Sequence, residues 1–217
     1  MQGCRPGLQP PKRSGGDKAG DLIDFQPRPR ASARDVLRTA TREVHERLHE
    51  HPRLKLLAGG RIGLGDYRDL LARLHGFHAA AETAFAQAAA FAPIDMAARR
   101  KAPLLRSDLT ALGLDAAAIA ALPLCLDLPS IDGPAALLGG AYVVEGSTLG
   151  GRTLAKAVEP LLGSTINGRR FLLGYGDRHG AMWRAFTDAL ETVPEPRHAR
   201  MAEAALATFA AFERWLD

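Results

Sequence analysis

The chain has 217 residues, 47% of them hydrophobic and 24% charged, which suits one globular domain with a sizeable core. Its formal charge of +4 is too small and too scattered to predict nucleic-acid binding. The uncharged stretch 133–144 is well short of the roughly 20 residues that span a bilayer. Cys4 and Cys125 provide no disulfide framework and no CxxC metal motif. We therefore expect a protein of the reducing cytoplasm that binds neither membrane nor nucleic acid.

The first 31 residues differ in composition from the rest of the chain. They contain five prolines and five glycines among several charges, and such a segment cannot bury enough apolar surface to offset its chain entropy. We predict a disordered N-terminal tail over 1–31 and a folded domain over 32–217.

Helical spacing of apolar residues recurs through the predicted domain. Ser32 and Asp35 resemble a capping box, so a helix should begin at Ser32 and end before Pro52. A second helix should run from Asp66 to a point before Pro93. Further helices are predicted at 96–111, 114–121, 134–159, 180–192 and 196–216. Because no stretch alternates as a strand does, the sequence predicts a single all-α domain of six to eight helices.

His45 follows Thr41 by four residues and precedes Leu48 by three, so we predict that it points inward with the apolar stripe of the first helix. One interpretation is a core histidine that is hydrogen-bonded to a neighbour. The other is a ligand-binding histidine, because Arg38 and Arg42 lie on roughly the same side and would meet the edge of a bound group. Heme, with an apolar face and two carboxylates, has this charge layout. The arginines could equally form a solvated helix edge.

Five glycines interrupt the predicted helix 134–159, and each costs up to about 1 kcal/mol relative to alanine. Gly139, Gly146 and Gly150 are separated by seven and four residues and form one stripe with Tyr142. Tight helix packing or a break in the helix would explain them. A flat ligand lying against bare backbone would explain them as well.

Two stretches carry a family resemblance: Leu-Arg-Thr-Ala-Thr-Arg-Glu-Val-His, which ends at His45, and Tyr-Val-Val-Glu-Gly-Ser-Thr-Leu-Gly-Gly, from Tyr142 to Gly151. They resemble the biliverdin-producing heme oxygenases, in particular bacterial members, and the similarity extends over about 33–216. It implies an all-α fold with heme between a proximal helix, here containing His45, and a kinked distal helix, here containing Gly146, Gly150 and Gly151.

The resemblance also implies roles for individual residues. His45 would be the axial ligand of the heme iron, with Glu43 or Glu46 orienting its other nitrogen. Arg38 and Tyr142 would contact the heme propionates, and Arg42 is a weaker candidate for that contact. Ser147 stands where several family members carry an aspartate that organises water. Proton delivery would then depend on ordered water beside Gly146, Ser147 and Gly150.

The reaction implied by the resemblance uses heme b as both cofactor and substrate and O2 as co-substrate. The products are biliverdin, CO and ferrous iron. No flavin or nicotinamide fingerprint is found in the sequence, because the glycines follow no strand of a βαβ unit. The implied electron donor is a ferredoxin or a reductase, and a bilin-binding protein is a candidate recipient of the product.

Two other functions fit parts of the sequence. A heme-binding or heme-storage protein could use the same scaffold without catalysis. In addition, His45–Glu46–Arg47–Leu48–His49 fits the zinc motif HExxH. A zinc site would need a third ligand, for which Glu82, His75 or His78 could be proposed, and it would leave the glycine stripe unexplained. The heme and zinc hypotheses both make His45 a metal ligand, but only the zinc hypothesis makes His49 one.

Overall fold

A computed structural model describes residues 1, 3 and 31–217 of the chain. The chain divides into two units, 1–30 and 31–217. The tail predicted over 1–31, including Cys4, lies almost wholly outside the described residues, and its disorder stays a prediction. The second unit is described throughout and carries every residue considered for the site.

The second unit contains only helices, so the predicted all-α fold is confirmed. Eleven α-helices occur in residues 31–217, more than the six to eight expected, because several are only one or two turns long. They are α1 (Ala33–Glu50), α2 (Pro52–Ala58), α3 (Leu64–Gln87), α4 (Ala102–Ala111), α5 (Ala116–Ala120), α6 (Pro134–Gly146), α7 (Gly151–Ala157), α8 (Glu159–Leu162), α9 (Arg170–Leu173), α10 (His179–Leu190) and α11 (His198–Leu216). None of these helices is long and apolar enough to cross a membrane.

The first helix begins and ends as the sequence predicts. The Ser32 hydroxyl accepts a hydrogen bond from the Asp35 amide at 3.1 Å, which satisfies one of the free amides of the first turn. The carboxylate of Glu191, just after α10, accepts two more, from the amides of Ala33 and Arg34. Pro52 ends α1 but also starts α2, since proline fits the first turn of a helix.

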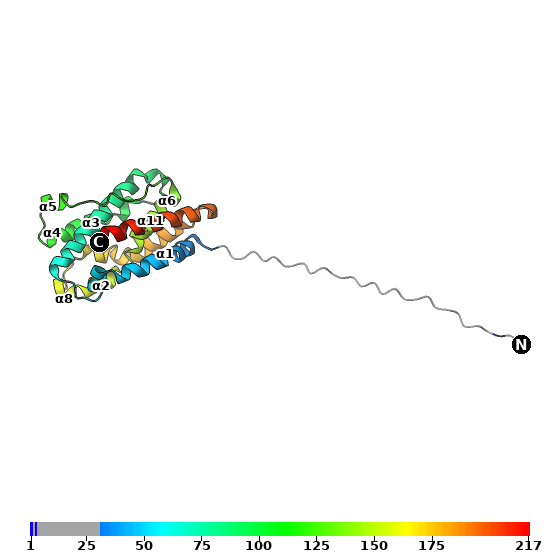
Figure 1. Cartoon of the computed structure of the whole chain (residues 1–217), viewed down its shortest axis with the longest axis horizontal. Helices are drawn as coiled ribbons and strands as arrows, with labels where there is room; N and C mark the ends of the chain where they lie inside the picture. The colour runs from blue at the N-terminus through cyan, green and yellow to red at the C-terminus, as the bar shows by residue number, and fades with distance from the viewer. Residues whose placement is uncertain (2, 4–30) are drawn as a thin grey trace. The chain divides into compact units, whose positions relative to one another are not determined.

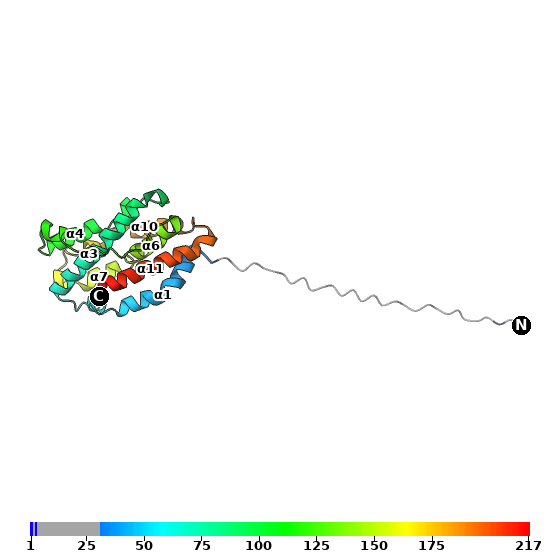
Figure 2. The ribbon, with the colours of Figure 1, turned by 45° about the horizontal axis from the view of Figure 1, so that its top comes forward.

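Helix α11 lies at the centre of the packing. It contacts α1 on one side and α6 on the other, and Figures 1 and 2 show the red α11 beside the blue α1 in both views. The α6–α11 crossing is very close, because a Cβ placed on Gly139 would lie 2.1 Å from the Met201 carbonyl oxygen. The glycine at position 139 therefore serves tight helix packing, which is one of the two explanations given above for the glycine stripe.

The single helix predicted over 134–159 is wrong. Helix α6 ends at Gly146, a turn covers 147–150, and α7 starts at Gly151. Ser147 and Thr148 each donate a side-chain hydrogen bond of 2.7 Å to the carbonyl three residues earlier, which competes with helix continuation next to two poor helix formers. This break is the kink that the family resemblance implies, and Gly150 consequently lies outside α6.

Candidate functional site

His45 lies on the flank of α1 rather than among its buried residues, so the prediction that it points inward with the apolar stripe is wrong. The buried face of the helix is formed by Leu37, Thr41, Val44 and Leu48, whereas His45 is exposed. The reason is geometric: at about 100° per residue, His45 is rotated about 80° from Leu37 around the helix axis. The imidazole therefore borders the core and faces the space beside it.

Arg38 shares this flank of α1, about 20° from His45 around the axis, while Arg42 lies about 60° from His45 on the same side. Both arginines are exposed. Arg38 pairs with Asp35 at 3.0 Å, and both members of this pair are largely in solvent. Such an exposed pair contributes little to stability, so Arg38 remains available to a ligand on that flank.

Tyr142 is half-buried on α6 and packs against Trp183 of α10, with 6.3 Å between the ring centroids. Burial raises the pKa of Tyr142, while hydrogen bonding with Thr41 and the positive charges of Arg34 and Arg38 act in the opposite direction. Arg38 therefore lies close enough for its charge to act on Tyr142, and the contact of both residues with heme propionates stays a prediction. The structure adds Arg34, which the sequence analysis missed although it lies one turn before Arg38.

Two junctions join the α1–α2 layer to the α6–α7 layer. Thr41 meets Tyr142 at one of them. At the other, α2 contacts α7, and Gly60 lies against the Ala157 carbonyl oxygen. Moving one helical turn on from the first junction leads to His45 along α1 and to Gly146 along α6. We expect His45 and the 147–150 turn to face the same region between the two junctions.

The glycines of this segment fall into two groups. A Cβ on Gly151 would lie 2.2 Å from the Leu172 carbonyl oxygen, so Gly151, like Gly139, permits close packing. The missing side chain of Gly151 makes room for α9, and its contact with a ligand stays a prediction. Gly146 and Gly150 are different, because a Cβ on either would have no atom within 4 Å. With the exposed Ser147 they form a backbone surface that is open to a ligand.

The protonation state of the His45 imidazole suits metal binding. The pKa of this imidazole is lowered, mainly because surrounding protein atoms partly desolvate the ring even though the side chain is exposed, and next by the neighbouring His49, while Glu46 opposes the shift through its charge. A histidine with a lowered pKa is neutral at pH 7, and neutral imidazole is the form that coordinates iron or zinc. Glu46 therefore influences His45 electrostatically, while the prediction that Glu43 or Glu46 orients its other nitrogen stays a prediction.

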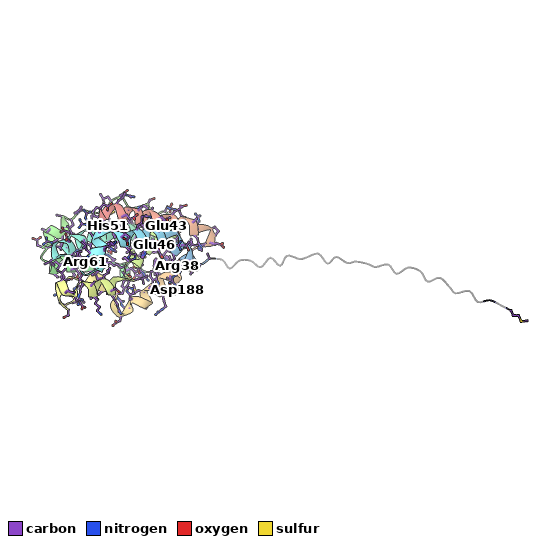
Figure 3. The ribbon with its side chains drawn as sticks, turned by 60° about the horizontal axis from the view of Figure 1, so that its bottom comes forward. Arg38, Glu43, Glu46, His51, Arg61 and Asp188 are labelled. Atoms are coloured by element: carbon purple, nitrogen blue, oxygen red, sulfur yellow. The ribbon has the colours of Figure 1, made fainter. Side chains whose placement is uncertain are left out.

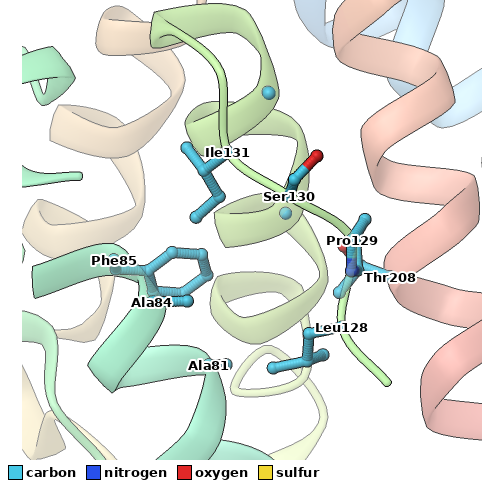
Figure 4. Close-up of a pocket in the computed structure, with 10 residues that line it drawn as sticks. Ala81, Ala84, Phe85, Leu128, Pro129, Ser130, Ile131 and Thr208 are labelled. Carbon is cyan, nitrogen blue, oxygen red and sulfur yellow. The ribbon is translucent and has the colours of Figure 1, made fainter. Parts of the chain in front are cut away.

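Two hollows elsewhere do not suit heme. One is a cavity of about 10 Å³ between α3, α6 and α11 (Figure 4), which has room for at most a single water molecule. The other is an open depression of about 800 Å³ beside α1 and the end of α11, and Figure 3 shows three of its residues, Glu43, Glu46 and His51, on the same face of the molecule as Arg38. Five of the eight residues that line it are acidic, so it would repel the two heme carboxylates.

The zinc hypothesis is left without a third ligand. Glu82 accepts hydrogen bonds from the amides of Lys101 and Ala102 and so caps α4. His75 and His78 are buried in the core. Among residues 31–217, no group of three or more histidine, cysteine, aspartate or glutamate side chains could hold a metal ion.

A buried charged cluster adjoins the 147–150 turn and could not be predicted from the sequence. Glu145 accepts hydrogen bonds from Arg99, Lys101 and Tyr175 at 2.6, 2.6 and 2.7 Å. Glu145 is 2% exposed and Lys101 is fully buried. These partners are 30 to 46 residues from Glu145 in the chain, so no local pattern could have indicated the cluster.

The structure thus defines an all-α protein that has a histidine-bearing first helix and a helix broken at its glycines. The family model for heme oxygenase matches residues 31–217. The chain belongs to the heme oxygenase family.

Solved structures of bacterial heme oxygenases have the same fold. The heme oxygenase from Leptospira interrogans has a TM-score of 0.72 and 16% identity, over 86% of this chain and 98% of that one. The NO- and CO-bound heme oxygenase from Neisseria meningitidis has a TM-score of 0.68 and 22% identity, over 86% and 91%. Heme oxygenase-1 from the cyanobacterium Synechocystis sp. PCC6803, in complex with heme, has a TM-score of 0.64 and 17% identity, over 86% and 91%. A comparison with curated protein sequences gives no match.

Proposed function

We propose that this chain is a heme-degrading oxygenase, which converts heme b, O2 and externally supplied electrons into biliverdin, CO and ferrous iron. One observation carries the proposal. A Cβ on Gly146 or Gly150 would have no atom within 4 Å, and His45, whose pKa is lowered, lies one helical turn beyond Thr41, which hydrogen-bonds with Tyr142 of α6. Among the five glycines of residues 139–151, only Gly146 and Gly150 are open: a Cβ on Gly139, Gly140 or Gly151 would meet other atoms within 4 Å.

The described residues fit heme at each part of its surface. His45 would ligate the iron as neutral imidazole. Gly146 and Gly150 would allow a flat ring to approach the backbone closely, because neither has a side chain or a neighbour in the way. Arg34, Arg38 and Tyr142 would hold the two carboxylates, with Arg42 further round the helix as an additional cation.

Bound heme would supply the redox-active iron and the ring that is oxidised. The contribution of the chain would be to orient the heme and to limit access to it. Ser147 is exposed and donates its hydroxyl hydrogen to the Val144 carbonyl at 2.7 Å, so its oxygen is left to accept a hydrogen bond from a water molecule. Ser147 would thereby hold water, and with it protons, beside the open glycines. Electrons would come from a ferredoxin or a reductase, and a bilin-binding protein could receive the product.

A heme-storage function is the second candidate, because the same walls would bind heme without cleaving it. Hemin added to the purified protein should give a Soret band in both cases. On addition of a reductant in air, an oxygenase bleaches that band and yields biliverdin, whereas a storage protein retains it. A stable Soret band under these conditions would replace the proposed function with storage.

The axial ligand is tested with two variants of one helix. His45→Ala should abolish the native Soret spectrum and turnover, while His49→Ala, one turn further along α1, should keep both at neutral pH. Unchanged turnover in His45→Ala would overturn the assignment of His45. Stoichiometric zinc binding that depends on both histidines, without affinity for hemin, would support the hydrolase instead.

A further inference from the structure

We propose that Glu145 is a positioning residue, which fixes the 147–150 turn and with it the open glycine wall of the site. The importance of this wall for heme rests on the proposed function. The mechanical role of Glu145 does not, because it follows from contacts within the protein. Glu145 is buried in the core immediately before Gly146, and we do not assign it contact with a ligand.

The side chain of Glu145 fixes the C-terminal end of α6 through its partners in the core. Its two carboxylate oxygens are shared among Arg99, Lys101 and Tyr175. Arg99 also donates to the Met182 carbonyl of α10 at 3.2 Å, and Lys101 also donates to the Tyr175 hydroxyl at 3.1 Å. The last turn of α6 is therefore tied to the segment that precedes α4 and to the start of α10.

The backbone of Glu145 fixes the turn itself. Its carbonyl oxygen accepts both the amide of Thr148, at 3.2 Å, and the hydroxyl of Thr148, at 2.7 Å. Thr148 is 6% exposed, so this double contact lies inside the protein. A shift of Glu145 would consequently move Thr148, which sits between Ser147 and the open Gly150.

The other end of the turn is anchored to the same stretch of chain. Gly151 packs against the Leu172 carbonyl of α9. The carboxylate of Asp108 in α4 accepts the amides of Arg170 and Phe171, each at 2.8 Å, and so holds the start of α9. Residues 99–108 thus support both sides of the turn, through Glu145 on one side and through Asp108 and α9 on the other.

Electrostatics makes Glu145 the critical member of the cluster. Burial lowers the pKa of Lys101, and the adjacent Glu145 carboxylate is the largest opposing influence. Removing the carboxylate charge would leave two buried cations without their counter-ion, which is far more unfavourable than losing the whole group. The turn should then lose its support locally, in addition to any loss of global stability.

Hydrogen exchange on the heme-free protein tests this role directly. In Glu145→Gln, the amides of 147–151 should exchange about tenfold faster or more than in the wild type, as expected for a lost charged hydrogen bond. The control is Leu216→Ala, which removes a buried α11 side chain outside the cluster. Exchange at 147–151 that rises no more in Glu145→Gln than in this control would overturn the proposal.

Two further variants keep the test decisive. Adding Lys101→Met to Glu145→Gln removes one uncompensated cation, so protection of 147–151 should partly return. Tyr175→Phe deletes one hydrogen bond but leaves the ion pairs, so it should fold even if Glu145→Gln does not, with a smaller rise in exchange at the same amides. No rise in Tyr175→Phe, together with no rescue by Lys101→Met, would refute the positioning role.

Binding of hemin supplies an independent readout. Glu145→Gln should bind hemin at least about fivefold more weakly, because binding must then also order the turn. If the wild type binds no hemin, the proposed function fails while the exchange data still decide the role of Glu145. If hemin affinity is unchanged although exchange at 147–151 is faster, the turn does not form the heme wall.

Discussion

His45 and His49 lie one turn apart on α1, with ring centroids 4.6 Å apart and ring planes inclined by 76°. Their proximity has an electrostatic consequence, because His49 helps to lower the pKa of His45. The second histidine of the HExxH pattern thus acts on the first through charge, with no third metal ligand among residues 31–217.

The first prediction concerns the pH dependence of hemin binding. As pH falls through the pKa of His45, which lies below its ordinary 6.5, the imidazole takes up a proton and can no longer ligate iron. His49→Ala should raise that pKa, so hemin affinity should decline at a higher pH than in the wild type. Glu46→Gln should shift the decline to lower pH, because Glu46 raises the pKa of His45. Titration of hemin by the Soret band over a pH series measures both shifts, and shifts in the same direction would contradict the assignment.

The second prediction separates open from packing glycines. Gly150→Leu should weaken hemin binding at least about 100-fold by filling the site, as expected when a bulky group occupies a binding surface. Its effect on melting temperature should be small, because Gly150 is exposed and its φ of −86° suits any residue.

Gly139→Ala is the matched control. Its Cβ would meet the Met201 carbonyl, so unfolding should become easier by about 1–3 kcal/mol, the usual effect of overpacking. The folded fraction should bind hemin normally. Loss of hemin affinity in Gly139→Ala but not in Gly150→Leu would reverse the two roles.

The third prediction concerns the cations beside Tyr142. Replacing both Arg34 and Arg38 by glutamine should lower hemin affinity about 3- to 10-fold at low salt, the scale of two exposed ion pairs. Arg47→Gln, on the opposite flank and paired with Glu213, should leave it unchanged. Hemin dimethyl ester lacks the carboxylates, so its affinity should be the same for the wild type and the double variant. An equal loss for the ester would show that the arginines act otherwise than through carboxylates.

The fourth prediction concerns stability in acid. Burial lowers the pKa of His78 to about 3, against 6.5 for an ordinary histidine. The unfolded chain therefore binds a proton that the folded chain refuses, and stability is lost as pH falls below 6.5 towards about 3, by about 1.4 kcal/mol per pH unit. In His78→Leu, urea unfolding at pH 6 and pH 4.5 should show a shallower decline, by about 2 kcal/mol over this interval. Comparison at pH 8 isolates the packing effect of the substitution, and parallel pH curves would disprove the role of His78.

Much of the fold could be predicted from local signals. Ser32 and Pro52 mark the limits of α1 because capping and proline geometry act within a few residues. The break after Gly146 was missed because helical periodicity continues through it, although two glycines with Ser147 and Thr148 between them disfavour a helix locally. Helix α9 has four residues and depends on Asp108, 62 residues earlier in the chain, which no local pattern reveals.

The candidate site was predictable to a similar extent. His45, Arg38 and the glycines stand out by their spacing, and the family resemblance assigns them to a proximal and a distal helix. The sequence could not show which glycines pack and which remain open, because that depends on where Met201 and Leu172 lie. Nor could it indicate Glu145, whose three partners come from distant segments.

Helix α10 places one further constraint on the molecule. Glu191 at its end holds the first turn of α1, and Trp183 in its middle contacts Tyr142 of α6. Helix α10, which supplies neither the histidine nor the glycines, thus links α1 to α6. Under the proposed function, changing the length of α10 would alter the separation of these two helices, and with it the thickness of ligand that fits, without altering any residue assigned to the heme site.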